Sequence, residues 1–157
     1  MYFDRITLEN MGVGAVNDEL IIHFNSNALE HASFSEKVKQ INYVTNEEKV
    51  SVPVVTLDSY FKNNSITEVD FIKIDTEGFE SEVFKGAKRI FEKLKPKFIQ
   101  IEFNWHQLFH NTSLHYFSQQ LPGYEMYQLI PNGWILRDPK DPLVNIYSYS
   151  NFIFSLK

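Results

Sequence analysis

The chain has 157 residues, the length of a single domain of ordinary size. Apolar residues make up 43% and aromatic residues 15%, so the chain can form a core, and this composition excludes a disordered protein. Fifteen basic and twenty acidic side chains give a net charge of -5, which argues against a nucleic-acid partner, and the lack of cysteine excludes disulfides, thiolate metal sites and cysteine nucleophiles.

No apolar run approaches the ~18 residues of a membrane span. The first ten residues, MYFDRITLEN, lack the basic start and the apolar stretch of a signal peptide. These observations predict a cytoplasmic protein with no membrane partner.

The first 50 residues have a weak pattern, in which polar stretches separate short apolar runs. These runs are Ile6–Leu8, Val13–Val16 and Leu20–Phe24, and they predict one or two short strands and a long excursion. Val50–Leu57 is rich in β-branched residues and is expected to be extended, with Pro53 indicating a sheet edge or a strand end. Asp58 is expected to cap a short helix over Ser59–Asn63.

A strand–helix–strand pattern follows and is the clearest in the chain. Val69–Ile74 is short and β-branched, which predicts a strand buried mostly on both faces. A single apolar stripe from Phe79 to Leu94 predicts a helix whose charged residues, Glu80 among them, lie on the solvent face. Phe98–Phe103 is the second buried strand, and the crossover makes the two strands parallel.

The last 45 residues predict one more helix and a group of strands. The helix is Ser113–Leu121, and the strands are Tyr124–Ile130, Trp134–Arg137 and Ser150–Leu156. The fold class is therefore α/β, with a mostly parallel sheet and an antiparallel edge pair.

Ligands of open α/β sheets bind outside the carboxyl ends of the strands. The first buried strand ends at Asp75 and Glu77, and the second delivers Glu102 and then His106. Because adjacent parallel strands lie about 4.8 Å apart, Asp75 and Glu102 are expected to face one pocket. Three carboxylates and an imidazole at this rim would form an acid–base cluster.

Plainer interpretations exist for each of these residues. Asp75 or Glu77 can serve the N-terminus of the next helix, Gly78 can be a turn residue, and a lone loop histidine such as His106 is more often at the surface. Asp75, Glu77 and Glu102 could hold a hard divalent cation, but carboxylate clusters are unspecific, so the sequence assigns no metal. The chain has no Gly-x-Gly-x-x-Gly, P-loop, His-Glu-x-x-His or nucleophile elbow.

The segment Val69–Asn104 closely resembles the FkbM family of S-adenosylmethionine-dependent methyltransferases. The family pattern is a strand ending in Lys-apolar-Asp-x-Glu-Gly, a helix with Leu/Phe-x-Gly-Ala, a proline, and a strand ending in glutamate. This sequence has the corresponding residues at 73–78, 84–87, Pro96 and Glu102, and Val55–Asp58 is similar to the family's Thr-Leu-Asp segment. The likeness extends over roughly residues 10–110, where Gly12–Asn17 is similar to the third-strand region.

The resemblance implies a Rossmann-like sheet and S-adenosylmethionine as the cofactor. It also implies O-methylation of a sugar or natural-product hydroxyl, so the expected partner is a small-molecule or glycan acceptor. Methyl transfer to a hydroxyl benefits from a base that takes the proton. Within the resemblance His106 or Asp75 is the expected base and Glu102 orients the acceptor.

The sequence departs from the family in one respect. The glycine-rich first strand and the acidic residue of the second strand are missing, so the cofactor-binding residues are unknown and the sheet is truncated at the N-terminus. We expect a single partial domain over residues 1–157, in which 1–50 hold the third-strand region and the excursion and 51–157 hold the core units and the final strands. The chain is a fragment, or a partner or second copy supplies the missing half, or the cofactor site is lost.

Two other functions are compatible with the sequence. A non-catalytic remnant would bind a partner or its own copy through the bare sheet edge. A glycan hydrolase would use two of Asp75, Glu77 and Glu102 as acid and base, and it would need a cleft lined by aromatic side chains.

Overall fold

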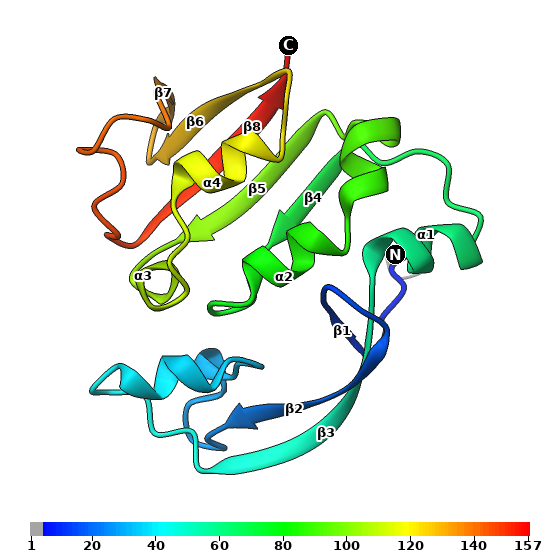
Figure 1. Ribbon diagram of the computed structural model, residues 1–157, viewed down its shortest axis with the longest axis vertical. Helices are drawn as coiled ribbons and strands as arrows, with labels where there is room; N and C mark the ends of the chain where they lie inside the picture. Colours follow the sequence, from blue (N-terminus) through cyan, green and yellow to red (C-terminus); the bar gives the residue numbers. More distant parts are fainter. Residues whose placement is uncertain (1–4) are drawn as a thin grey trace.

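The computed structural model describes residues 5–157, which form two β-sheets (Figure 1). The smaller sheet has the order β1-β3-β2, from strands β1 (Gly12–Val13), β2 (Asp18–Phe24) and β3 (Glu48–Val55). β2 and β3 are antiparallel along their whole length, whereas β1 pairs with β3 in parallel over two residues. The weak pattern of the first 50 residues thus resolves into an antiparallel pair, β2 and β3, whose long connection is the predicted excursion, with the two-residue strand β1 added in parallel.

The larger sheet has five strands in the order β4-β5-β8-β6-β7. They are β4 (Phe71–Ile74), β5 (Phe98–Phe103), β6 (Tyr124–Ile130), β7 (Gly133–Arg137) and β8 (Ser150–Leu156). β4 and β5 are parallel, as predicted, but every other neighbouring pair in this sheet is antiparallel. The expectation of a mostly parallel sheet is therefore wrong, because the final strand inserts antiparallel between β5 and β6 and a hairpin completes the edge.

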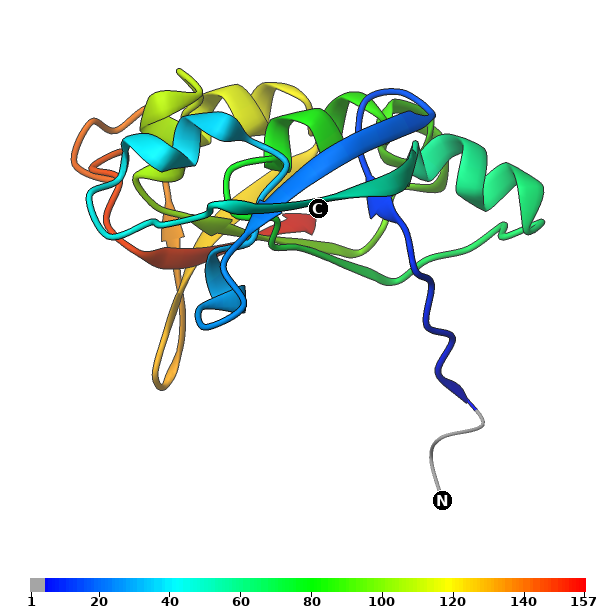
Figure 2. The ribbon, with the colours of Figure 1, turned by 90° about the horizontal axis from the view of Figure 1, so that it is seen from below.

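The helices are short, and α2 and α4 lie on one face of the larger sheet (Figure 2). They are α1 (Leu57–Asn63), α2 (Glu80–Lys85), the π-helix η4 (Ile90–Leu94), α3 (His106–Phe109) and α4 (Leu114–Gln119), with 3-10 turns η2 (Leu29–His31) and η3 (Glu36–Gln40) in the excursion. The single helix predicted over 79–94 is interrupted by a turn at Gly86 and Ala87.

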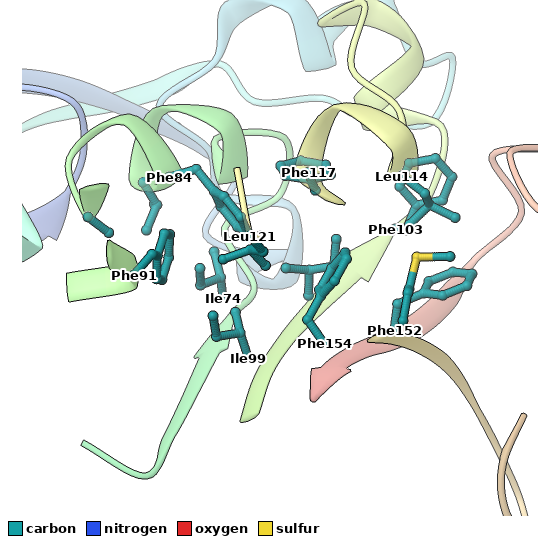
Figure 3. Close-up of a cluster of buried hydrophobic side chains, with 14 of the residues drawn as sticks. Ile74, Phe84, Phe91, Ile99, Phe103, Leu114, Phe117, Leu121, Phe152 and Phe154 are labelled. Atoms are coloured by element: carbon teal, nitrogen blue, oxygen red, sulfur yellow. The ribbon is translucent and has the colours of Figure 1, made fainter. Parts of the chain in front are cut away.

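The main core lies between the larger sheet and these helices (Figure 3). Ile74 and Ile99 project from β4 and β5 toward phenylalanine rings of the helices, and the Phe84 ring centroid lies 4.8 Å from that of Phe117. The prediction that β4 is buried on both faces is wrong: Ile74 is buried, but the Phe71 side chain on the other face is 48% exposed. β4 has one open face because the helices cover only the other face of the larger sheet (Figure 2).

Two contacts join the smaller sheet to the helix layer. A Cβ placed on Gly86 would lie 2.0 Å from the carbonyl oxygen of Gly14, so only glycine permits this backbone approach. The Asp58 carboxylate accepts hydrogen bonds from the backbone N–H groups of Arg89 (2.9 Å) and Ile90 (3.0 Å). The predicted role of Asp58 as the cap of its own helix is wrong, since Thr56 caps α1 and Asp58 caps the helical segment across the interface.

Pro53 lies two residues before the end of β3, which is the central strand of its sheet, so of the two predicted positions the strand end fits and the sheet edge does not. Its missing N–H is tolerated because β1 pairs only with Val54 and Val55, beyond the proline.

None of the helices within residues 5–157 has the length and apolar character needed to cross a bilayer.

Replacing Asp58 should destabilise the protein through this cross-interface cap. Asp58→Ala removes the acceptor of two backbone N–H groups, and we expect a loss of about 1–2 kcal/mol in the free energy of unfolding. Urea denaturation measures it, with Asp70→Ala as the matched control, because Asp70 is exposed and contacts only the exposed Lys97 side chain. Equal losses in both variants would contradict the capping role.

Candidate active site

The carboxyl ends of β4 and β5 lie side by side at one end of the strands of the larger sheet (Figure 1). Three carboxylates come together there. Asp75 and Glu77 follow β4, and Glu102 lies near the end of β5. One oxygen of each lies within 4.8 Å of the others. The predicted proximity of Asp75 and Glu102 is confirmed, and the crossover between parallel strands is its cause.

The loop after β4 has an unusual backbone. Glu77 has a φ of 49° and Gly78 a φ of 93°, so two consecutive residues are left-handed. A Cβ on Gly78 would lie 3.2 Å from the Cβ of His106, which leaves little room for a side chain. Gly78 is the predicted turn residue, whereas a left-handed glutamate is costly and is found mainly where surrounding contacts enforce it.

Those contacts come from Glu80, whose side chain is buried. Its Oε1 accepts hydrogen bonds from the backbone N–H groups of Thr76 (2.9 Å) and Gly78 (3.3 Å), and its Oε2 accepts one from the Gln107 amide (2.8 Å). The expectation that Glu80 lies on the solvent face of the helix is therefore wrong. Its carboxylate holds the loop that leads into α2, and the N-cap of α2, Phe79, has no side-chain cap. Burial raises the pKa of Glu80, while the hydrogen bonds from Thr76 and Gly78 oppose that rise.

Gln107 extends this network to β5 and was not singled out from the sequence. Its amide nitrogen also approaches the Glu102 carbonyl oxygen at 3.4 Å, and its amide oxygen accepts from the backbone N–H of Asn104 at 2.8 Å. Asn104 in turn accepts from the His106 N–H and donates to the Glu102 carboxylate at 3.0 Å. The only sequence signal was the position of Asn104 and Gln107 just after a buried strand.

His106 begins helix α3 and is only 3% exposed, so the prediction of a loop residue is wrong. Its Nδ1 lies 3.0 Å from Oε2 of Glu77, but the approach is out of line for a hydrogen bond. Neither ring nitrogen has a hydrogen-bond partner within the described chain. A buried imidazole without partners is costly, and here it faces a carboxylate of the cluster.

Glu102 is buried in the fold, with a side chain that faces like charges. Burial is the main cause that raises the pKa of Glu102, and the nearby carboxylates of Asp75 and Glu77 raise it further. The Tyr149 hydroxyl faces Glu102, and this interaction raises the pKa of Tyr149 to about 12. Lys73 forms an ion pair with Asp75.

The excursion between β2 and β3 packs against this edge of the sheet. The Ser33 hydroxyl donates to the carbonyl oxygen of Glu77 at 2.7 Å, and the Ser35 hydroxyl lies 2.6 Å from Nε2 of His110. A small apolar cluster of Val38, Ile41 and Val44 packs on Phe109 of α3. The excursion, which the sequence left without a role, thus forms one wall of the site.

A cavity of about 270 Å³ opens between the excursion and the strand ends. Glu77, Asn104 and His106 reach it from the site, and four aromatic side chains also line it: Tyr43, Trp105, Tyr147 and Tyr149. Aromatic walls with a few polar groups are typical of sites that bind a small molecule. Glu77 and His106 thus line the cavity, whereas Asp75 and Glu102 lie next to Glu77 but are not part of its lining.

The comparisons with known proteins give one result that bears on this site. A family model described as the methyltransferase FkbM domain matches residues 3–126, which include β4, β5 and the whole carboxylate cluster. No curated protein and no solved structure matches the chain significantly.

Removing the Glu80 carboxylate should loosen both strand ends. Glu80→Ala leaves the Thr76 and Gly78 N–H groups and the Gln107 amide without their acceptor, and we expect a loss of about 2–4 kcal/mol in the free energy of unfolding. Urea denaturation measures the loss, and Glu82→Ala, which removes only a side-chain contact with Lys85, is the matched control. A loss no larger than that of the control would show that the network does not hold the loop.

His110 should make stability fall in mild acid. Burial, and then the positive charge of Lys37, lowers the pKa of His110 below its usual 6.5. The unfolded chain therefore binds the proton more readily, so the contribution of His110 is complete above pH 6.5 and is lost as the pH falls through the lowered value. Between pH 7.5 and 5 the melting temperature of the wild type should fall more than that of His110→Gln. His115→Gln should follow the wild type, and identical slopes in all three would refute the prediction.

Proposed function

The chain belongs to the FkbM methyltransferase family, and from this premise we propose that it takes part in S-adenosylmethionine-dependent O-methylation of a sugar or natural-product hydroxyl. The observation that carries the proposal is the contact between His106 and Glu77 beside an aromatic cavity at the carboxyl ends of β4 and β5. Flat rings such as those of Trp105 and Tyr43 suit the apolar faces of a sugar or a planar natural product.

The acceptor hydroxyl must lose its proton during the transfer. His106 is the base that we propose, because its ring nitrogens are free of other hydrogen bonds and Glu77 lies 3.0 Å away, where it would stabilise the protonated ring. Glu102 is proposed to orient the acceptor, and Asp75 is the weaker candidate for the base because Lys73 already pairs with it. These roles are our assignments for the four residues at this edge.

The complete S-adenosylmethionine molecule, the methyl donor that the family implies, does not fit into the described cavity. The cavity, at about 270 Å³, is smaller than the sites that usually hold ligands of that size, and none of the residues lining it is a glycine. S-adenosylmethionine would supply an electrophilic methyl group, but its adenosine needs a surface outside this cavity. We assign no residue of the chain to the donor.

One structural observation favours a second candidate, a non-catalytic module that associates through a sheet edge. Within residues 5–157, β4 pairs on one side only, and Phe71 beside that open edge is 48% exposed. Such an edge can pair with a strand from another chain. The glycan-hydrolase alternative has the aromatic cavity that it requires, but the family match gives it no support.

Methyl transfer from radiolabelled S-adenosylmethionine to a panel of sugars and phenolic compounds tests the proposal. We expect transfer by the wild type and a loss of 10²–10⁴-fold in kcat for His106→Gln, the range for a general base. His115→Gln is the control histidine and should retain activity.

Binding and mass measurements separate the two candidates. If calorimetry detects no binding of S-adenosylmethionine and no acceptor is methylated, the proposal fails for this chain. A dimer in sedimentation, lost in Phe71→Lys but not in Leu143→Lys, would then support the module, since Leu143 is an even more exposed apolar side chain (79%) outside β4.

A further inference from the structure

The carboxylates of Asp75, Glu77 and Glu102 form a cluster with too little positive charge around it. Their nearest oxygens lie within 4.8 Å of one another, at a sheet edge where Glu102 is buried. Lys73 pairs with Asp75, and the neutral partners of Glu102 are the Asn104 amide and the Tyr149 hydroxyl. Three like charges at this spacing repel one another, and the repulsion is strongest where water is excluded.

His106 is the second, independent observation. The ring is 3% exposed, neither nitrogen has a hydrogen-bond partner in the described chain, and Nδ1 lies 3.0 Å from Oε2 of Glu77 without the alignment of a hydrogen bond. Two ligands held at right angles about 2.1 Å from one cation are themselves separated by about 3.0 Å. The spacing of His106 and Glu77 is compatible with two neighbouring ligands around an ion. The His106 nitrogens are not among the atoms that lie within 4.8 Å of one another, so His106 adjoins the cluster through Glu77.

We propose that Asp75, Glu77, Glu102 and His106 bind one divalent cation. The oxygens span at most 4.8 Å, close to twice the metal–oxygen distance, so small side-chain movements bring all of them into contact with a central ion. Carboxylate oxygens favour Mg²⁺, Ca²⁺ and Mn²⁺, and an added imidazole favours a transition metal. The combined set suits Mn²⁺ best. The ion would neutralise the cluster and give the His106 ring the partner that the protein does not supply.

The site borders the aromatic cavity, so a bound cation has a consequence for catalysis that rests on the proposed function. A cation beside the acceptor would bind the hydroxyl oxygen and lower its pKa. His106 would then act as a ligand instead of the base, the released proton would pass to water in the cavity, and methyl transfer would depend on Mn²⁺. Cation binding itself requires neither donor nor acceptor, so it is measured on the protein alone.

Titration of the protein with Mn²⁺, followed by electron paramagnetic resonance, tests the site. We expect a single bound ion and a loss of at least tenfold in affinity for Glu77→Gln, Glu102→Gln and His106→Gln, because each removes one ligand. Glu125→Gln is the control, since this carboxylate lies on β6 away from the cluster. Pulsed measurements on the wild type should show coupling of Mn²⁺ to an imidazole nitrogen that is absent in His106→Gln.

Circular dichroism of each variant separates the loss of a ligand from the loss of the fold, and the nearly isosteric Glu102→Gln keeps an acceptor for Asn104. No binding at millimolar Mn²⁺, equal affinity in all variants, or binding without nitrogen coupling would each overturn the site. None of these outcomes decides whether the chain transfers methyl groups. Conversely, if the protein binds Mn²⁺ but methylates nothing, the proposed cation site stands and the proposed function fails.

Discussion

The buried carboxylate of Glu80 is the interaction on which the geometry of the site depends. One of its oxygens holds the loop after β4 through Thr76 and Gly78, and the other holds Gln107, which is hydrogen-bonded to the end of β5. Apart from the strand ladder, the contact of His106 with Glu77 also links the two strand ends. Because the Gly78 and Gln107 donors are buried, losing the Glu80 carboxylate would leave them unsatisfied.

A small number of specific contacts also joins the two sheets. Asp58 lies in the first turn of α1, yet its carboxylate caps the helical segment that begins at Arg89. Gly86 permits the carbonyl of Gly14 to approach the end of α2. Residues conspicuous in sequence as a Thr-Leu-Asp segment and a Gly-Ala pair therefore act on one interface, which places the smaller sheet and its excursion beside the strand ends. The wall of the cavity depends on this placement.

The local pattern predicted the strands and the parallel β4–β5 pair, because burial on a sheet leaves a strong signature in residues such as Ile74 and Ile101. That pair alone sufficed to bring Asp75 and Glu102 together. Strand order and contacts between residues distant in sequence leave no such pattern in the sequence. The insertion of β8 between β5 and β6, the role of Asp58 and the burial of Glu80 each depend on partners distant in sequence. A charged residue on a helix is usually exposed, so only the fold reveals that Glu80 is not.

Unfavourable features are concentrated at one place in this molecule. Glu77 has a left-handed backbone, His106 is buried without hydrogen-bond partners, and Glu102 faces two other carboxylates. Each lowers stability, and chance would scatter such features over the chain. They instead meet at the carboxyl ends of two parallel strands, beside the aromatic cavity and within the region matched by the family model. A ligand that relieves the repulsion and satisfies the imidazole would offset two of these three costs, and this is the physical reason to regard the cluster as functional rather than structural.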